Sequence, residues 1–473
     1  MSELHQRLTH LPPSERGKLL ALLREDRDGA RQTPLRARGS GIEAPLSSAQ
    51  RTLWFLDRLT SGTNAYNLVH YYRITGDLNV EALREALRAL VRRQQILRTC
   101  LRENADGPIQ IVVPEVPVEL AVVDHTGGLD DCLDRARREV ATDRIPLDRA
   151  PLWRTGLYRC GADEHLFVFA IHHAVFDGAS ERIFCAELAE LYRAQLTKTR
   201  PMLPELTVQY SDFAHWQQER LAEDEIRRLT DLWREELDGV PELRLPHDRP
   251  RPAEFSYRGQ SMTGPLPADV PDAVDKLAKS LSTTTFVVYL AAFWVLLHQY
   301  TGQRDLVVGT SVSGRGRAQL AGLLGFFINI VPLRGHLADD AGFRDTVQQA
   351  ETKLRTAVAN SDLPFERVVH AVAPERRMDS SPLFQVTFAT APGIVAPELA
   401  GTKVEQLFLD HGSAQFDMAW AVVQSGQPVT VVQFNDDIFV PATITAMIEH
   451  YGRLVGWLVE HPDSPLHEAP APG

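Results

Sequence analysis

Cysteine is scarce in this sequence, and the cysteines it has are scattered. Only 4 of the 473 residues are cysteines, and no two of them form a C-x-x-C pair. That count excludes a disulfide scaffold, and the spacing excludes a cysteine metal site. We expect reduced, mostly buried thiols. The four are Cys100, Cys132, Cys160 and Cys185.

Long apolar runs and an export signal are also absent from the sequence. The longest apolar run, Phe286 to Leu297, is shorter than the roughly 20 residues that a membrane span needs. The N-terminus lacks the charged-then-apolar pattern of a signal peptide. The net charge of −12 argues against non-specific binding to nucleic acid or an anionic membrane. We therefore expect a cytoplasmic protein that binds neither.

The composition and the apolar periodicity indicate a globular α/β chain. Hydrophobic residues make up 44% of the sequence, and the length exceeds that of a typical single domain, so a divided core is expected. Residues 1–42 predict a short docking helix followed by a polar linker, with a dedicated partner-binding arm as the alternative. From Pro45 onward, strand and helix patterns alternate, which predicts two α/β lobes. The clearest predicted helices are 80–91, 180–196, 285–299 and 343–360, and the clearest strands are 166–171, 306–310 and 328–333.

Residues 165–180, HLFVFAIHHAVFDGAS, carry the most chemical information. A buried-type strand ends in His172-His173, and a helix is predicted to begin shortly after Asp177-Gly178. Successive strand residues point to opposite faces, so one histidine should face a cleft and the other the packing behind it. This geometry also disfavours a zinc site, because ligands on opposite faces cannot share an ion. Asp177 could orient an imidazole, pair with an arginine or cap the helix.

Other catalytic motifs are missing from the chain. There is no G-x-S-x-G serine elbow and no Walker-type phosphate loop. The Gly314-Arg315-Gly316-Arg317 stretch lacks the third glycine of a dinucleotide fingerprint, so we interpret it as a basic surface turn. The chemistry that the sequence offers is therefore a general-base histidine without a covalent intermediate.

With these residues in view, the chain resembles the condensation domains of nonribosomal peptide synthetases, within the chloramphenicol-acetyltransferase-like superfamily. The resemblance spans about residues 43–462, and its motifs occur in the family's order. Two motifs depart from the usual pattern, since Thr52 replaces an arginine and Gln94-Gln95 replaces a His-Glu pair. The motifs are residues 48–56 (SAQRTLWFL), 93–99 (RQQILRT), 172–178 (HHAVFDG), 210–216 (YSDFAHW), 325–329 (GFFIN), 362–366 (DLPFE) and 377–383 (RMDSSPL).

The resemblance implies an α/β fold of two acetyltransferase-like lobes in a V-shaped pseudo-dimer, with the active site in a tunnel between them. We expect an N-terminal helical segment and linker (1–42), an N-terminal lobe (43–195), a C-terminal lobe (196–462) and a tail (463–473). The implied reaction is attack of an amine or hydroxyl on a thioester carried by the phosphopantetheine arm of a partner carrier protein. No cofactor or metal bound by this chain is expected.

The resemblance also implies roles for individual residues. His173 would position and deprotonate the nucleophile, and His172 would be its packed partner. Asp177 would be mainly structural, paired with an arginine such as Arg98. Gly178 would allow close backbone approach and offer an N–H to the oxyanion. For Asn329 two roles stay open, lining the substrate cleft or packing between the lobes.

The ends of the sequence favour a free-standing enzyme, since neither a carrier nor an adenylation motif accompanies the two lobes. We expect a monomer that meets its acyl or peptidyl carrier protein in trans and acylates a small-molecule acceptor in natural-product biosynthesis. Arg315 and Arg317 are candidates for the carrier-docking patch. Two alternatives stay open. One is an acyl-CoA-dependent acyltransferase of the same superfamily, and the other is a non-catalytic platform that recruits a partner enzyme.

Overall fold

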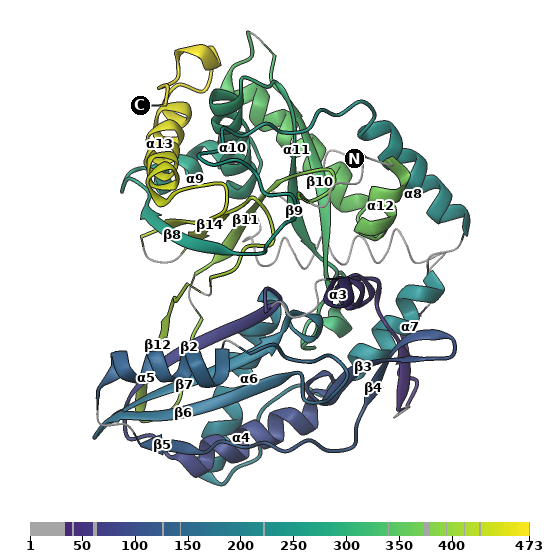
Figure 1. The fold of residues 1–473 in the computed structure, drawn as a ribbon, viewed down its shortest axis with the longest axis vertical. Coiled ribbons are helices and arrows are strands. Elements are labelled where there is room, and N and C mark those ends of the chain that lie inside the picture. The colour runs from purple at the N-terminus through teal and green to yellow at the C-terminus, as the bar shows by residue number, and fades with distance from the viewer. Residues whose placement is uncertain are drawn as a thin grey trace. The chain divides into compact units, whose positions relative to one another are not determined.

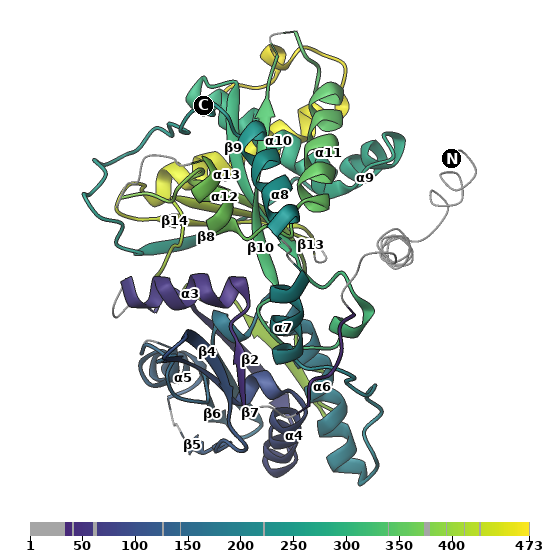
Figure 2. The same cartoon turned by 90° about the vertical axis from the view of Figure 1, so that its right-hand side faces the viewer.

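The computed structural model describes residues 34–39, 42–59, 64–124, 127–141, 143–220, 223–338, 340–372, 379–393, 395–410, 412–424 and 427–472. Most of the predicted N-terminal helix and linker, and the first two residues of the 377–383 motif, lie outside these ranges. The chain divides into two compact units (Figures 1 and 2). Of the described residues, those within 1–222, 313–328 and 394–409 form unit 1, and those within 223–312, 329–393 and 410–473 form unit 2.

This division differs from the expected lobe boundary after residue 195, because three later segments join unit 1, namely residues 196–222, 313–328 and 394–409. Helix α7 (Tyr210–Arg220) packs on strand β1 (Glu43–Pro45). Strand β12 (Thr402–Leu407) pairs antiparallel with β2 (Asn67–Gly76). Pairing between distant segments of this kind leaves no local signal in the sequence. The final residues, expected as a tail, belong to unit 2, where Leu466 and Ala469 are buried.

Unit 1 is built on a five-stranded sheet with the order β12-β2-β7-β6-β5. Figure 2 shows helix α5 on one side of this sheet and helices α4 and α6 on the other. The strands and helices are β5 (Val122–Asp124), β6 (Trp153–Gly161), β7 (Glu164–His172), α4 (Val80–Arg93), α5 (Leu129–Ala136) and α6 (Gly178–Thr197). Eight of the nine residues of β7 are buried. Covered on both faces, this strand carries the continuous apolar run seen in the sequence.

Helix α4 illustrates why the local sequence folds as it does. The side chain of Asn79 accepts a hydrogen bond from the Ala82 N–H at 2.9 Å and so caps the first turn. Leu83, Leu87 and Leu90 recur at helical spacing and are all buried. The helix ends at Arg93, because Gln94 is extended.

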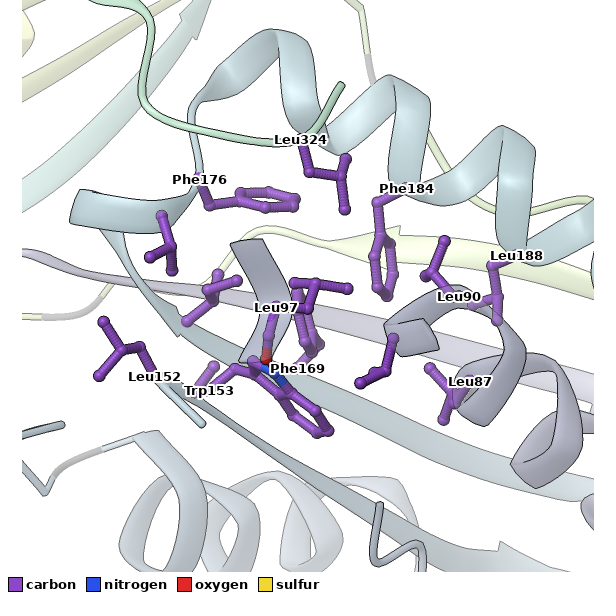
Figure 3. Packing of buried hydrophobic residues seen from close by; sticks show 14 of the residues in the cluster. Leu87, Leu90, Leu97, Leu152, Trp153, Phe169, Phe176, Phe184, Leu188 and Leu324 are labelled. Atoms are coloured by element: carbon purple, nitrogen blue, oxygen red, sulfur yellow. Dashed lines mark hydrogen bonds between the residues drawn. The ribbon is translucent and has the colours of Figure 1, made fainter. Parts of the chain in front are cut away.

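The core of unit 1 lies between α6 and the five-stranded sheet. Figure 3 shows Phe176 and Phe184 facing Phe169 of β7. The Phe169 and Phe184 rings stack with centroids 4.4 Å apart, and Phe176 meets Phe169 edge-on at 5.9 Å. This aromatic layer fixes the start of α6 against the end of β7, where the HHxxxDG segment lies. Unit 1 also contains α3 (Ser48–Leu59) and the small antiparallel sheet of β1, β4 (Gly107–Val112) and β3 (Thr99–Asn104).

Unit 2 contains a six-stranded sheet with the order β10-β9-β11-β13-β14-β8, in which β11 runs parallel to β9 and β13. Its strands are β8 (Gly259–Pro265), β9 (Asp305–Ser313), β10 (Ile328–His336), β11 (Val386–Pro392), β13 (Met418–Gln424) and β14 (Val429–Asn435). Its helices are α8 (Glu223–Glu236), α9 (Val270–Ser280), α10 (Thr285–Thr301), α11 (Phe343–Ala359), α12 (Phe365–Val372) and α13 (Pro441–Glu460). Helices α9, α11 and α13 surround α10, and α8 packs on α12.

Helix α10 is the long apolar run of the sequence, and it is the core helix of unit 2. Every residue from Val287 to Leu297 is buried, as expected from a run too short to span a membrane. Among the described residues, no single helix is long and apolar enough to cross a membrane. The pair α9 and α10 passes that test by length and composition only, and it is bent by 108°.

The predicted α/β class and all the clearest predicted elements are confirmed, with ends that differ by a few residues. The four cysteines are free and buried, also as predicted.

Candidate active site

The first histidine of the pair is buried at the last position of β7. His172 pairs with Asn67 of β2, and its side chain is almost fully enclosed. Its Nδ1 accepts a hydrogen bond from the Ala174 N–H at 3.0 Å, so a neutral ring carries its proton on Nε2. Burial, reinforced by neighbouring His173 and Arg144, lowers its pKa to about 3. His172 is therefore a neutral packing residue.

The second histidine begins a 3-10 turn, His173–Val175, and is only half-buried. Its Nδ1 lies 2.6 Å from the carbonyl oxygen of Phe176. A carbonyl can only accept, so Nδ1 carries the proton and Nε2 keeps its lone pair. Burial lowers the pKa of His173, although the Phe176 carbonyl and Asp177 oppose that shift. The result is an oriented imidazole that is neutral at pH 7 and able to accept a proton at Nε2.

Asp177 is fully buried and caps helix α6. Its Oδ1 accepts hydrogen bonds from the N–H and the hydroxyl of Ser180, both at 2.8 Å. Its Oδ2 accepts from the Arg315 guanidinium at 2.5 Å and from the Phe327 N–H at 3.1 Å. With both oxygens engaged, the carboxylate ties the start of α6 to residues 315–327.

The prediction that Arg98 pairs with Asp177 is therefore wrong. Arg98 donates instead to the carbonyl oxygen of Val113 at 2.8 Å. Arg315 takes the place that we assigned to Arg98, although 138 residues separate it from Asp177 along the chain. Neither a charge pattern nor a periodicity links positions that far apart, so the sequence left the choice of arginine open.

The interpretation of Gly314–Arg317 as a basic surface turn fails at Arg315. Its side chain is only 8% exposed, and its guanidinium lies 4.1 Å from the centre of the Phe327 ring. It also donates to the Ser180 hydroxyl at 2.9 Å and to the Leu323 carbonyl at 3.1 Å. Arg315 therefore cannot serve as an exposed docking residue. Arg317 packs its guanidinium over the buried Trp216 ring at 4.8 Å.

Gly178 is the first residue of α6, and no neighbouring atom explains why it is a glycine. Its φ lies outside the left-handed region, and a Cβ added there would meet no atom within 4 Å. The residue is exposed. The open space above its backbone lies directly after the Asp177 cap, at the positive end of a 20-residue helix.

Asn329 lies in unit 2, where all of its polar side-chain atoms are engaged. Its Nδ2 donates to the carbonyl oxygens of Ser361 and Leu363, both at 2.8 Å. Its Oδ1 accepts from the Phe365 N–H at 3.2 Å. Asn329 thus holds the 361–365 turn against β10, which favours a packing role within unit 2 over contact with substrate.

Two side chains without a predicted role, Gln50 and Ser180, support the His173 turn and its surroundings. The buried Gln50 donates to the Ala174 carbonyl at 3.2 Å and accepts from the Ser47 N–H at 3.1 Å. Ser180 ties Asp177 to the 325 backbone through hydrogen bonds with the N–H and carbonyl of Gly325. Both Gln50 and Gly325 lie within the motifs of the resemblance, and that was the available signal.

Tyr210 links Ser47, the residue just before the opening motif, to the 325–329 motif. Its hydroxyl donates to the Phe326 carbonyl at 2.5 Å and lies 2.9 Å from the Ser47 hydroxyl. Gly325, with φ of +156°, lets the Tyr210 ring approach the backbone closely, because a Cβ there would be 2.1 Å from Tyr210 Cδ2. Burial raises the pKa of Tyr210 above its ordinary range, so the phenol stays protonated and donates.

The altered second motif keeps a polar network. Gln94 donates to Glu187 at 3.0 Å and to the Gly322 carbonyl at 2.9 Å, and it accepts from the Leu324 N–H at 3.1 Å. Glu187 also pairs with Arg93 at 2.8 Å. A glutamine therefore suffices to hold the 322–324 backbone. Across the described ranges, no group of three or more His, Cys, Asp or Glu residues could hold a metal ion.

The fold and these contacts together define a class of protein. This is an α/β protein whose chemical centre is a neutral, oriented histidine at the end of a buried strand, held by a glutamine and a buried ion pair. The condensation domain family matches residues 42–471, so the chain belongs to that family. Condensation domains form amide or ester bonds on carrier-bound substrates in natural-product biosynthesis, and the predicted acyltransferase class is thereby confirmed.

Two relatives illustrate the similarity in sequence. The chain is 35% identical over 482 residues to phosphinothricin tripeptide synthetase PhsC of Streptomyces viridochromogenes, covering 99% of this chain and 44% of that protein. It is 34% identical over 451 residues to chondramide synthase cmdD of Chondromyces crocatus, covering 93% of this chain and 11% of that protein. The chain thus spans less than half the length of each.

Two solved structures are similar in fold. The X-domain from teicoplanin biosynthesis superposes with a TM-score of 0.82 at 25% identity, covering 93% of this chain and 100% of that chain. The SgcC5 protein from Streptomyces globisporus superposes with a TM-score of 0.74 at 26% identity, covering 89% and 100%.

Proposed function

We propose that this chain condenses a carrier-bound acyl or aminoacyl thioester with an amine or hydroxyl acceptor, with His173 as the general base. The observation that carries the proposal is the 2.6 Å bond from His173 Nδ1–H to the Phe176 carbonyl, which leaves Nε2 as the proton acceptor. The lowered pKa supports it, because the ring is unprotonated at neutral pH.

The reaction balances without a covalent enzyme intermediate. His173 Nε2 takes the proton of the acceptor as its nitrogen or oxygen bonds to the thioester carbon. The tetrahedral intermediate collapses with cleavage of the C–S bond. The departing pantetheine thiolate then takes the proton from the imidazolium, so the products are an amide or ester and a free carrier thiol.

The backbone of Gly178 lies open to the oxyanion that develops in the reaction. The exposed backbone at the first residue of α6 has no side chain to obstruct a ligand, and the helix N-terminus favours negative charge there. Asp177 acts indirectly in this proposal, because its oxygens are used to fix α6 and Arg315. Arg98 and Asn329 likewise support the backbone around them and do not touch substrate.

The partners follow from the family's chemistry. The chain itself carries no cofactor in this proposal, since the acyl group arrives on the phosphopantetheine arm of an acyl or peptidyl carrier protein. We propose that the carrier binds in trans, that the acceptor is a small molecule, and that the enzyme works as a cytoplasmic monomer.

A second function has one observation in its favour. The X-domain that superposes on this chain has been solved as a complex with OxyB, again with a TM-score of 0.82 and 25% identity. A recruitment platform would bind a partner enzyme through the same fold without turnover. The oriented base at His173 supports catalysis over recruitment.

The test uses acyl-loaded carrier protein, a panel of small amines and alcohols, and the variant His173→Ala, with mass spectrometry of carrier and product. We expect acceptor-dependent release of the acyl group by the wild type and loss of at least about 100-fold in the variant. Equal rates with acyl-CoA alone would establish the soluble acyltransferase instead. Partner binding without turnover by either protein would establish the platform.

A further inference from the structure

A second polar cluster lies beside the proposed base, entirely within unit 1. Glu181 of α6 is its centre, and Glu181 Oε1 is contacted from two neighbouring strands. His70 Nδ1 of β2 lies 2.7 Å from this oxygen, and Gln406 Nε2 of β12 donates to it at 2.6 Å. The Tyr72 hydroxyl adds a longer hydrogen bond at 3.4 Å.

These contacts hold the carboxylate in one position. The His70 ring is itself packed against Phe176, with ring centroids 5.7 Å apart, and stacks near Phe169 at 6.4 Å. Gln406 is fixed in turn, because its Oε1 accepts from the Val395 N–H at 3.3 Å. Burial would raise the pKa of Glu181, but the hydrogen bond and the charge interaction with His70, together with the hydrogen bonds from Gln406 and Tyr72, outweigh burial and lower the pKa. The group is therefore an ionised, immobilised carboxylate.

One oxygen of this carboxylate is still available to a ligand. All three contacts reach Oε1, and in the described part of the chain Oε2 has no hydrogen-bond donor. The Glu181 side chain remains 20% exposed. No arginine or lysine among the described residues forms an ion pair with it, and its basic partner is the His70 imidazole, which contacts Oε1 and leaves Oε2 open.

The position of Glu181 relates it to the reaction. It lies three residues after Gly178 on the same helix, so the two residues are neighbours on the helix surface. Its partner His70 packs on the Phe176 ring, and the carbonyl of Phe176 is the group that orients His173. A substrate held at His173 and Gly178 is therefore close to this carboxylate.

The chemistry of the ligand follows from the charge. A fixed carboxylate stabilises the protonated form of a nearby amine, which would oppose deprotonation of the attacking nucleophile. It suits a cationic group that does not react. We propose that Glu181 is a specificity-determining residue, and that its Oε2 binds a non-reacting ammonium group of the substrate.

This inference rests on the proposed function, and the ammonium group could belong to either substrate. It would be the free α-amino group of an aminoacyl donor, or a second amine on the acceptor. The shared chemistry is the ammonium, and paired probes separate the two sources. For the donor the pair is alanyl- and propionyl-pantetheine amide, in which a stable amide replaces the thioester. For the acceptor it is 3-aminopropan-1-ol and propane-1,3-diol.

The experiment measures the binding of each probe by titration calorimetry to the wild type, Glu181→Gln and Glu190→Gln. Glu190 is the matched control, since it lies on the same helix and pairs with Arg193. We expect the wild type and Glu190→Gln to bind one ammonium probe at least about 10-fold more tightly than its neutral counterpart. Glu181→Gln should reduce that ratio to about 1.

The pair in which the ratio falls identifies the source of the ammonium. Absence of any preference in the wild type, or a preference that persists in Glu181→Gln, overturns the proposal. Binding does not depend on turnover, so the two proposals can fail separately. Turnover that is unaffected by His173→Ala would refute the proposed base, while an ammonium preference lost in Glu181→Gln would still establish the role of Glu181.

Discussion

Asp177 and Arg315 form a buried ion pair in which carboxylate and guanidinium lie 2.5 Å apart, with side-chain exposures of 0% and 8%. The pair joins the cap of α6 to the 315–327 segment. Because Ser180 and the Phe327 N–H occupy the remaining acceptor sites of Asp177, the aspartate of the HHxxxDG motif has a structural role.

Removal of Asp177 should therefore destabilise the fold. Asp177→Ala leaves the Arg315 charge buried without a counter-ion and removes the α6 cap. We expect the free energy of unfolding to fall by about 3–5 kcal/mol. Urea denaturation followed by circular dichroism measures it. The control is Asp134→Ala, which breaks an exposed pair with Arg137 and should cost less than about 1 kcal/mol. A comparable small loss for both variants would contradict the structural role.

The dependence of kcat/KM on pH in the acid range should reflect the pKa of His173. Burial lowers the pKa of this imidazole below 6.5, so kcat/KM should rise with pH through a midpoint below 6.5 and then level off. The profile is measured with acyl-loaded carrier between about pH 5 and 8, over which an unperturbed histidine would titrate. A midpoint above 6.5 would indicate a different base or a different protonation state.

His172 should make folding sensitive to acid. Its pKa is about 3 in the folded protein and 6.5 for an ordinary histidine. Between these two pH values, the unfolded chain therefore binds a proton at His172 that the folded chain does not bind. The stability that depends on the neutral ring is complete above pH 6.5 and is lost progressively as the pH falls toward 3. The slope is about 1.4 kcal/mol per pH unit.

The matched variant is His172→Gln, whose side-chain oxygen can still accept the Ala174 N–H. Urea denaturation at pH 6.0 and 5.0 should show a difference in stability that is smaller in this variant by about 1 kcal/mol. Identical pH dependence in both proteins would mean that His172 protonates freely in the folded state.

Substitution by alanine should reduce stability at one glycine of the site and activity at another. Gly325→Ala places a Cβ 2.1 Å from the Tyr210 ring, and it should lower the free energy of unfolding by about 1–3 kcal/mol. Gly178→Ala meets no neighbouring atom, so its stability should change by less than about 0.5 kcal/mol. Under the proposed function its activity should nevertheless fall at least about 10-fold. Denaturation curves and condensation rates are measured for both.

The outcome for Gly178→Ala separates two explanations of this glycine. Loss of stability together with activity would mean that the fold requires it. Full activity in the variant would show that no ligand group approaches the backbone there.

Local patterns in the sequence were sufficient to predict the secondary structure. Leu83, Leu87 and Leu90 gave α4, the apolar run before His172 gave β7, and the run from Phe286 gave α10. Each of these predictions depends on residues within a few turns of one another, where periodicity determines which face is buried.

The partners of the site residues were not predictable in this way. We expected Arg98 as the partner of Asp177 and placed Arg315 in a surface turn. A guanidinium is available at both positions, and only the fold brings one of them to the carboxylate. The same limit applies to β12, whose pairing with β2 spans more than 320 residues along the chain. Such contacts arise when distant segments pack, and their free energy leaves no trace in local spacing.

The sequence by itself determined the family, the α/β class and the HHxxxDG histidines, since these depend on residue identity and short-range periodicity. Only the tertiary structure decided that His173 carries its proton on Nδ1, that Arg315 neutralises Asp177, and that Glu181 keeps one oxygen without a donor. The reason is physical. A tautomer, an ion pair and a free lone pair are fixed by groups that burial and packing bring together from β2, α6, β12 and the 315–327 segment.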